Sequence, residues 1–382
     1  MLAEYEGVAV RWYDITIMKL DYTSLTQQVT QADIAAYKAT KSSQSLKTQK
    51  WAVVGFTVFG LIVFISIMMP AIIDLFSGQL VGLLPFASWA VMLAVITVVA
   101  IVYGRYLERR QAKLYRFVAQ NNLQLIEDRA NPGYAGMIFD EGHARKINEA
   151  IILPEGTELG NYEYVTGSGK NRSTHTYGYV KIPLTRNLPH MVLDGKANNL
   201  FGIITGLSDS FDRSQKLSLE GDFDNYFTLY APKEYERDAL YVFTPDVMRV
   251  LIDEGKRFDM EIVDNYLYVY SNVRFDLTSP ERLASLVKII DTVGSEIRAQ
   301  TKRYADEKVD ASQAGIIAQG GRRLNKGMSL ILLVALAMIT LNIVLSVLDA
   351  AHNPVATFFY VAAGVGLWVV FAIGFLSRFR NR

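Results

Sequence analysis

The stretch GNYEYVTGSGKNRSTHTYGYV, residues 160–180, has a tyrosine-rich segment on each side of a glycine-containing loop. Tyr162 and Tyr164 alternate with other residues before the loop, and Tyr177 and Tyr179 do so after it. Alternation with a period of two is typical of a half-buried strand, and aromatic side chains favour strands. We therefore predict two strands joined as a β-hairpin.

The loop of this hairpin has the glycine and the lysine of a phosphate-binding loop but lacks the rest of that motif. The motif requires a glycine where this chain has Tyr164, and a serine or threonine where it has Asn171. The loop is therefore interpreted as a turn rather than as a nucleotide site. A lysine at a glycine-rich tip is still suited to contact an anionic ligand, so Lys170 and Asn171 are candidate ligand-binding residues.

A second candidate pair lies in LPHMVLDG, residues 188–195. Strand alternation places His190 and Asp194 on one face, where a carboxylate is suited to tune an imidazole for acid–base chemistry. The alternative is a structural role at a sheet edge. The chain has four histidines without metal-ligand spacing and no cysteine, so we predict neither a metal site nor a cofactor.

The chain beyond residue 240 mixes helical and strand patterns. Thr244 is a predicted N-cap followed by proline, and Gly255 is the predicted end of that helix. Residues 258–271 form two strand-like runs around an Asp-Asn pair, which predicts a hairpin. Residues 279–310 form a predicted helix with one apolar face: Leu283, Leu286, Val287, Ile290, Val293 and Ile297. This order favours an α+β fold.

Four runs without charged residues lie at 51–69, 80–104, 328–348 and 354–377. Each is long enough for a helix to cross a hydrocarbon core about 30 Å thick. They predict two transmembrane α-helical hairpins, the alternative being buried helices of a soluble core. Lysine and arginine are concentrated in the flanks outside the short hairpin connections, which predicts that both termini and the central domain are cytoplasmic.

The charge of the chain is divided unevenly. Residues 117–310 carry 22 basic against 30 acidic side chains, and the remainder carries 17 against 8. An acidic domain is unsuited to bind a phosphate backbone, so no nucleic-acid partner is expected. The predicted organisation is a cytoplasmic segment (1–50), a transmembrane hairpin (51–104), a cytoplasmic α+β domain (105–310), a basic tether (311–327), a second transmembrane hairpin (328–377) and a basic tail (378–382).

Several segments between residues 120 and 272 resemble an uncharacterised family of bacterial membrane proteins that carry a domain of unknown function. The residues that carry the resemblance are Leu219, Glu220, Phe223, Phe227, Tyr230, Thr244, Pro245 and Met248. The resemblance implies a bacterial inner-membrane setting, and it implies no reaction, cofactor or catalytic residue.

The predicted function is that of a non-enzymatic integral membrane protein with four spans, located in the cell (inner) membrane. Its acidic cytoplasmic domain is expected to bind a partner or ligand, as in a scaffold or sensor. The alternative is a membrane-tethered enzyme that uses His190 and Asp194 on a small or lipidic substrate. The expected partners are the lipid bilayer and a cytoplasmic protein, and homo-oligomerisation stays open.

Overall fold

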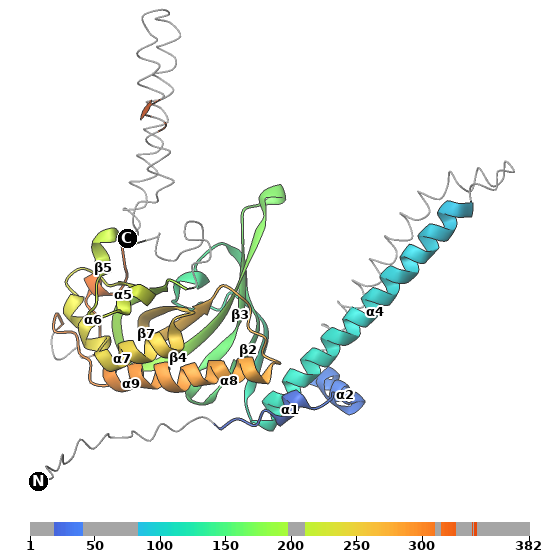
Figure 1. Cartoon of the computed structure of the whole chain (residues 1–382), viewed down its shortest axis with the longest axis horizontal. Coiled ribbons are helices and arrows are strands. Elements are labelled where there is room, and N and C mark those ends of the chain that lie inside the picture. Colours follow the sequence, from blue (N-terminus) through green and yellow to red (C-terminus); the bar gives the residue numbers. More distant parts are fainter. Residues whose placement is uncertain are drawn as a thin grey trace, which may run out of the picture. The chain divides into compact units, whose positions relative to one another are not determined.

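The computed structural model describes residues 19–40, 83–197, 211–309 and 315–325, together with three positions near residue 340 (Figure 1). The chain divides into two compact units. Unit 1 comprises Met1–Pro183 and Tyr270–Ser295, and unit 2 comprises Leu184–Val269 and Glu296–Arg382. The fold is a mixed α/β fold with one antiparallel sheet of seven strands, in the order β1-β2-β3-β4-β6-β5, with β7 also paired to β4.

The described residues of unit 1 begin with the short helices α1 (Thr23–Thr26) and α2 (Gln31–Thr40) and the long helix α4 (Leu83–Gln120). Arg116 on α4 ties the short helices to the long one. Its guanidinium donates to the Asp33 carboxylate at 2.8 Å and to three backbone carbonyls in the α1–α2 region. The charged second half of α4 is therefore bonded to the α1–α2 region of unit 1.

The strands of unit 1 are β1 (Gln124–Ala130), β2 (His143–Ile152), β3 (Glu158–Thr166) and the first part of β4 (Ser173–Gly195). Neighbouring strands pair antiparallel, each with the next along the chain. This meander places β1 at one end of the strand order.

The predicted tyrosine hairpin is confirmed as the β3–β4 pair, in which Tyr162 lies opposite Tyr177. Its loop requires a glycine at one position in particular. Gly167 has a φ of +70°, and a Cβ there would lie 2.2 Å from the carbonyl oxygen of Asn171. Only glycine tolerates both the left-handed backbone and this approach.

The predicted helix after residue 279 is confirmed as far as Thr301. It consists of α8 (Pro280–Ile289), a π-helical turn (Ile290–Gly294) and α9 (Ser295–Thr301). Ser279 caps α8, because its hydroxyl accepts the backbone N–H of Arg282 at 3.3 Å. All six residues of the predicted apolar face are buried.

Unit 2 contains the rest of β4, the short elements β5 (Lys216–Leu217), α5 (Phe223–Tyr226), β6 (Phe227–Tyr230), α6 (Glu236–Val242) and α7 (Pro245–Val250), and all but the last two residues of β7 (Asp259–Ser271). The predicted cap at Thr244 is confirmed, since its side chain accepts the Val247 N–H. A π-helical turn continues α7 to Gly255, the predicted end of the helix.

The predicted hairpin at residues 258–271 is wrong, because this segment forms one continuous strand, β7. A two-residue hairpin turn of the expected type requires a positive φ at both central residues. Asp264 has a φ of +53°, but Asn265 is not among the residues with positive φ. The chain therefore has an irregularity at Asp264 without reversing its direction.

The prediction of an α+β domain between two transmembrane hairpins is wrong. Among the residues that the structure describes, no helix is both long and apolar enough to cross a membrane. The predicted span 80–104 is not a separate element: from Leu83 it is the first part of α4, which continues without interruption through charged residues to Gln120. The sequence criterion, a window without charge, did not detect that continuation.

The other three predicted spans, 51–69, 328–348 and 354–377, lie outside the described residues, apart from the three positions near residue 340. The finding on the described helices also overturns the predicted multi-pass location in the inner membrane, with both termini and the central domain in the cytoplasm. What the structure supports in its place is the mixed α/β fold with its seven-stranded antiparallel sheet.

Candidate functional site

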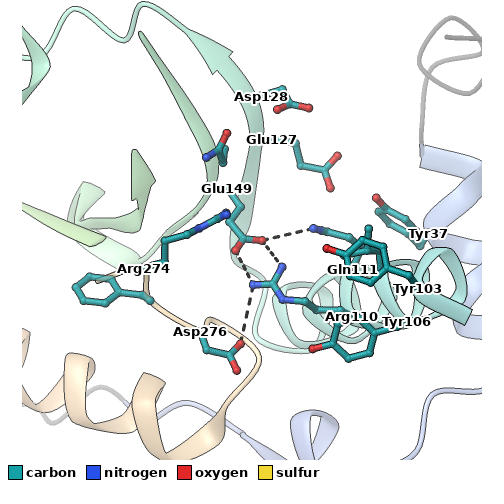
Figure 2. Close-up of a pocket in the computed structure, with 13 residues that line it drawn as sticks. Tyr37, Tyr103, Tyr106, Arg110, Gln111, Glu127, Asp128, Glu149, Arg274 and Asp276 are labelled. Carbon is teal, nitrogen blue, oxygen red and sulfur yellow. Dashed lines mark hydrogen bonds and ion pairs between the residues drawn. The ribbon is translucent and has the colours of Figure 1, made fainter. Parts of the chain in front are cut away.

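A cavity of about 500 Å³ opens in unit 1 among residues of α4, β1 and β2 (Figure 2). One tyrosine of α2 and the segment that follows β7 complete its lining. We call this cavity the tyrosine–carboxylate pocket. Its lining residues are Tyr37, Tyr103, Tyr106, Leu107, Arg110, Gln111, Glu127, Asp128, Asn148, Glu149, Arg274, Phe275 and Asp276.

The helical wall of the pocket follows from the spacing of five residues on α4. Tyr103, Tyr106, Leu107, Arg110 and Gln111 occur at i, i+3, i+4, i+7 and i+8, so they share one helix face. The rings of Tyr103 and Tyr106 stack with centroids 6.4 Å apart, and the two residues are 61% and 60% exposed. The open side of the pocket therefore presents two aromatic surfaces.

The inner part of the pocket contains a buried ion pair between α4 and β2. Arg110 donates to both carboxylate oxygens of Glu149, at 2.8 and 2.6 Å, and Glu149 is only 3% exposed. Asn161 Nδ2 donates to the same carboxylate at 3.2 Å. The hydrogen bonds to Glu149 raise the pKa of the Arg110 guanidinium, against the opposing effect of burial. The charge of Arg110 is thus already compensated within the protein.

Asn161 also fixes the segment after β7. Its amide Nδ2 donates to the Phe275 carbonyl at 2.9 Å, and its Oδ1 accepts the Phe275 N–H at 2.7 Å. The Phe275 ring packs on Gly178, where a Cβ would lie 2.6 Å from ring atom Cδ1. The residues on either side of Phe275 are therefore held at the pocket.

Asp276 is kept ionised at one rim of the pocket. Burial alone would raise its pKa, but hydrogen bonds from the Thr278 hydroxyl and N–H, at 2.7 and 3.0 Å, act in the opposite direction. Arg110, 3.9 Å away, adds to this effect. Together these groups hold the pKa of Asp276 below its usual range.

The strand wall of the pocket depends on two backbone irregularities. The β2–β3 register shifts between Ile147 and Glu149, which is a bulge at Asn148, and Asp128 on β1 has a φ of +47°. Successive strand residues normally point to opposite faces of a sheet. Irregularities of this kind redirect side chains. This explains why the consecutive residues Glu127 and Asp128 both line the pocket, as Asn148 and Glu149 do.

The lining of the pocket carries more negative than positive charge. It has four carboxylates against the guanidinium groups of Arg110 and Arg274. Within the described part of the chain, the carboxylates of Glu127 and Asp128 have no ion pair or side-chain hydrogen bond, and neither has Arg274. The side-chain oxygen of Gln111, Oε1, is buried and has no hydrogen-bond partner among the residues that the structure describes. Figure 2 shows Glu127 and Asp128 on the strand side, with Tyr37, Tyr103 and Tyr106 on the helix side.

Lys170 and Asn171, two of the predicted ligand-binding residues, lie in unit 1 at the tip of the β3–β4 hairpin. They belong to the short 3-10 turn Gly169–Asn171 and are exposed. Neither residue lines the tyrosine–carboxylate pocket. Their predicted role in ligand binding stays a prediction.

His190 and Asp194, the other two predicted residues, are buried on β4 in unit 2, each 4% exposed. His190 Nε2 lies 2.8 Å from Glu261 Oε1 on β7, so the carboxylate beside the imidazole is Glu261 rather than Asp194. His190 lines neither the tyrosine–carboxylate pocket nor a smaller cavity of unit 2, which lies among residues of α5 and α7. The two functions predicted from the sequence, a four-span membrane protein and a membrane-tethered enzyme, both lack the membrane-spanning helices that they require among the described residues.

None of the pocket residues was predicted from the sequence. The spacing of Tyr103, Tyr106 and Arg110 was a usable signal, but the predicted boundary after residue 104 placed Tyr103 in a membrane span and the other two residues in the cytoplasmic domain. Glu127, Glu149 and Asp276 meet only in the folded chain. Among the described residues, no group of three or more histidine, aspartate or glutamate side chains is arranged to hold a metal ion.

Comparison with known proteins gives no match. No family model, no curated protein and no solved structure matches the chain. The pocket is therefore interpreted from its own geometry and charge.

Proposed function

We propose that unit 1 recognises the cationic group of a lysine or arginine side chain, presented by a protein partner, in the tyrosine–carboxylate pocket. One observation carries this proposal. The stacked rings of Tyr103 and Tyr106 share the pocket with the carboxylates of Glu127 and Asp128, which have no ion-pair partner among the described residues.

Aromatic surfaces and free carboxylates favour the same kind of ligand. The face of a tyrosine ring attracts a cation, with a contribution of about 0.5–2 kcal/mol that depends on desolvation. A carboxylate accepts charge-assisted hydrogen bonds from ammonium or guanidinium N–H groups. An anionic ligand would have only Arg274 to bind, because Arg110 is held by Glu149.

The open form of the pocket favours a side chain presented by a protein over a free small molecule. Small-molecule sites usually enclose most of their ligand in a mainly apolar cavity. Here Tyr103 and Tyr106 are more than half exposed, and charged residues make up much of the lining. A partner protein supplies the additional surface that covers these rings on binding.

The proposal is tested by calorimetric titration of the full chain with short blocked peptides that differ at one central residue: lysine, arginine, norleucine or glutamate. We expect the lysine and arginine peptides to bind, and the norleucine and glutamate peptides not to bind. Tyr106→Ala should weaken binding by about 2-fold to 30-fold, the range that corresponds to one cation–π contact. Tyr106→Phe retains the ring and is the matched control.

Variants that change the charge at the rim of the pocket give an independent test of whether the ligand is a cation or an anion. Glu127→Gln should weaken binding of the cationic peptides, whereas Arg274→Ala should leave it unchanged or strengthen it, because a competing positive charge is removed. The proposal is wrong if the glutamate peptide binds and Arg274→Ala abolishes that binding. Equal binding of the norleucine and lysine peptides would also contradict it.

A further inference from the structure

The segment 315–325 belongs to unit 2 and is held to the rest of that unit by hydrogen bonds near both of its ends. At its start, Asn187 Nδ2 donates to the Gly315 carbonyl at 2.5 Å. At its end, the Gln215 side chain both donates to the Asn325 carbonyl, at 2.8 Å, and accepts the Asn325 N–H, at 2.9 Å. The segment is therefore held by side chains of unit 2 that mimic backbone pairing.

His190 makes the most deeply buried of these contacts. Its Nδ1 accepts the backbone N–H of Leu324 at 2.9 Å, while its Nε2 lies 2.8 Å from Glu261 Oε1. A backbone N–H is always a donor, so Nδ1 must be unprotonated. The ring proton is then on Nε2 and is donated to Glu261. The geometry thus requires a neutral imidazole in one tautomer.

Protonation of His190 is incompatible with one of its two contacts and favourable for the other. An imidazolium ion has N–H groups on both nitrogens. The Nε2–H group keeps Glu261 and gains an ion pair. The new Nδ1–H group faces the Leu324 N–H, and two donors cannot share a hydrogen bond. Leu324 N–H then has no acceptor in a buried position, which is unfavourable unless the segment moves away.

Glu261 is the carboxylate in direct contact with His190, at 2.8 Å. Arg323, next to Leu324 in the chain, is already paired with Asp264 on β7 at 2.9 and 3.1 Å. The Phe211 ring contacts the imidazole in an edge-to-face arrangement, with centroids 6.3 Å apart. Within unit 2, the charged residues on the elements packed against His190 are Arg186 and Asp194 on β4, Asp212 beside Phe211, Asp259, Glu261 and Asp264 on β7, and Arg322 and Arg323 in the segment.

We propose that His190 is a pH-sensitive latch for the end of this segment, residues 322–325. When His190 is neutral, the end of the segment is bound to unit 2. When His190 is protonated, its bond to Glu261 is strengthened and residues 322–325 are released. The latch is independent of the tyrosine–carboxylate pocket, since all of its residues belong to unit 2.

The test is hydrogen exchange of the full chain at about pH 5 and about pH 8, the range over which histidine changes charge. After correction for the pH dependence of intrinsic exchange, the amides of Leu324 and Asn325 should lose about tenfold in protection at the lower pH. The amides of β4 and β7 should stay protected, which distinguishes local release from acid unfolding. Equal protection of Leu324 at both pH values would overturn the proposal.

Two variants separate the latch from a merely structural role of His190. His190→Gln keeps an acceptor and a donor but does not titrate, so its segment should show the same protection at both pH values. Glu261→Gln keeps a hydrogen-bonding side chain but removes the ion pair that the imidazolium gains, so the loss of protection at about pH 5 should be smaller than in the natural chain. A pH response that survives in His190→Gln would also overturn the proposal.

Discussion

The ion pair between Arg110 and Glu149 allows a quantitative prediction about the anchoring of α4 to the sheet. The perturbation is Glu149→Leu, which removes a carboxylate that is 3% exposed and leaves its guanidinium partner without compensation. Breaking a buried pair from one side costs about 3–5 kcal/mol. The Arg110 side chain is 20% exposed, so water compensates part of the loss, and we expect about 3 kcal/mol.

The double variant Arg110→Met/Glu149→Leu shows whether this loss comes from the uncompensated charge. Apolar residues of similar volume often replace a buried ion pair at little or no cost. We therefore expect the double variant to be within about 1 kcal/mol of the natural chain. Lys146→Met is the control, because Lys146 on β2 pairs with Glu163 at 3.4 Å but is 40% exposed, and exposed pairs contribute about 0–1 kcal/mol.

The assay is urea denaturation followed by circular dichroism, together with hydrogen exchange of the β2 and β3 amides. Exchange is needed because two compact units need not unfold in one transition. A loss below about 1 kcal/mol for Glu149→Leu would refute the reasoning, as would a double variant that is no more stable than this single one.

Further predictions concern glycine positions, a helix cap and alkaline pH. Gly160→Ala should cost about 1–3 kcal/mol in urea denaturation because its Cβ would lie 2.4 Å from that of Ala150. Gly104→Ala, with no atom within 4 Å, should instead stabilise α4 by about 0.5–1 kcal/mol, and equal effects of the two would contradict this. Ser279→Ala should cost about 1 kcal/mol and lower the exchange protection of the first turn of α8; unchanged protection would exclude the cap. Burial raises the pKa of Tyr162 from 10.0 to about 12, so its contribution to stability is complete below pH 10.0 and is lost as the pH rises toward about 12. Urea midpoints measured across this range should fall, and Tyr162→Phe should reduce the fall.

The parts of the fold that were predicted correctly depend on local patterns. The alternation around Tyr162 and Tyr177 predicted the β3–β4 hairpin, the threonine and proline signals predicted where α7 begins, and the apolar spacing after residue 279 predicted the helix that contains α8. The failure at Asp264 is also local, because a turn-like pair of residues does not determine the φ angles that the strand imposes on them.

The candidate site was not predictable in the same way. Arg110 and Glu149 are 39 residues apart, and Asn161 and Phe275 are 114 apart. No periodicity links such residues, since only the strand order and a bulge bring them together. The apolar runs were misinterpreted for a related reason: a window that measures charge does not report that α4 continues to Gln120.

The amide of Asn161 has a consequence for the order in which the chain matures during synthesis. Its two bonds to Phe275 join β3 to a segment that leaves the ribosome only after residues 184–269 of unit 2 have been made. The strands β1 to β3 contain mostly local contacts and are able to form early. The tyrosine–carboxylate pocket is completed late, so we expect stalled chains that end before Phe275 to show exchange-protected β1–β3 amides but no binding of cationic peptides. Growing chains would then carry a folded sheet edge before they carry a recognition site.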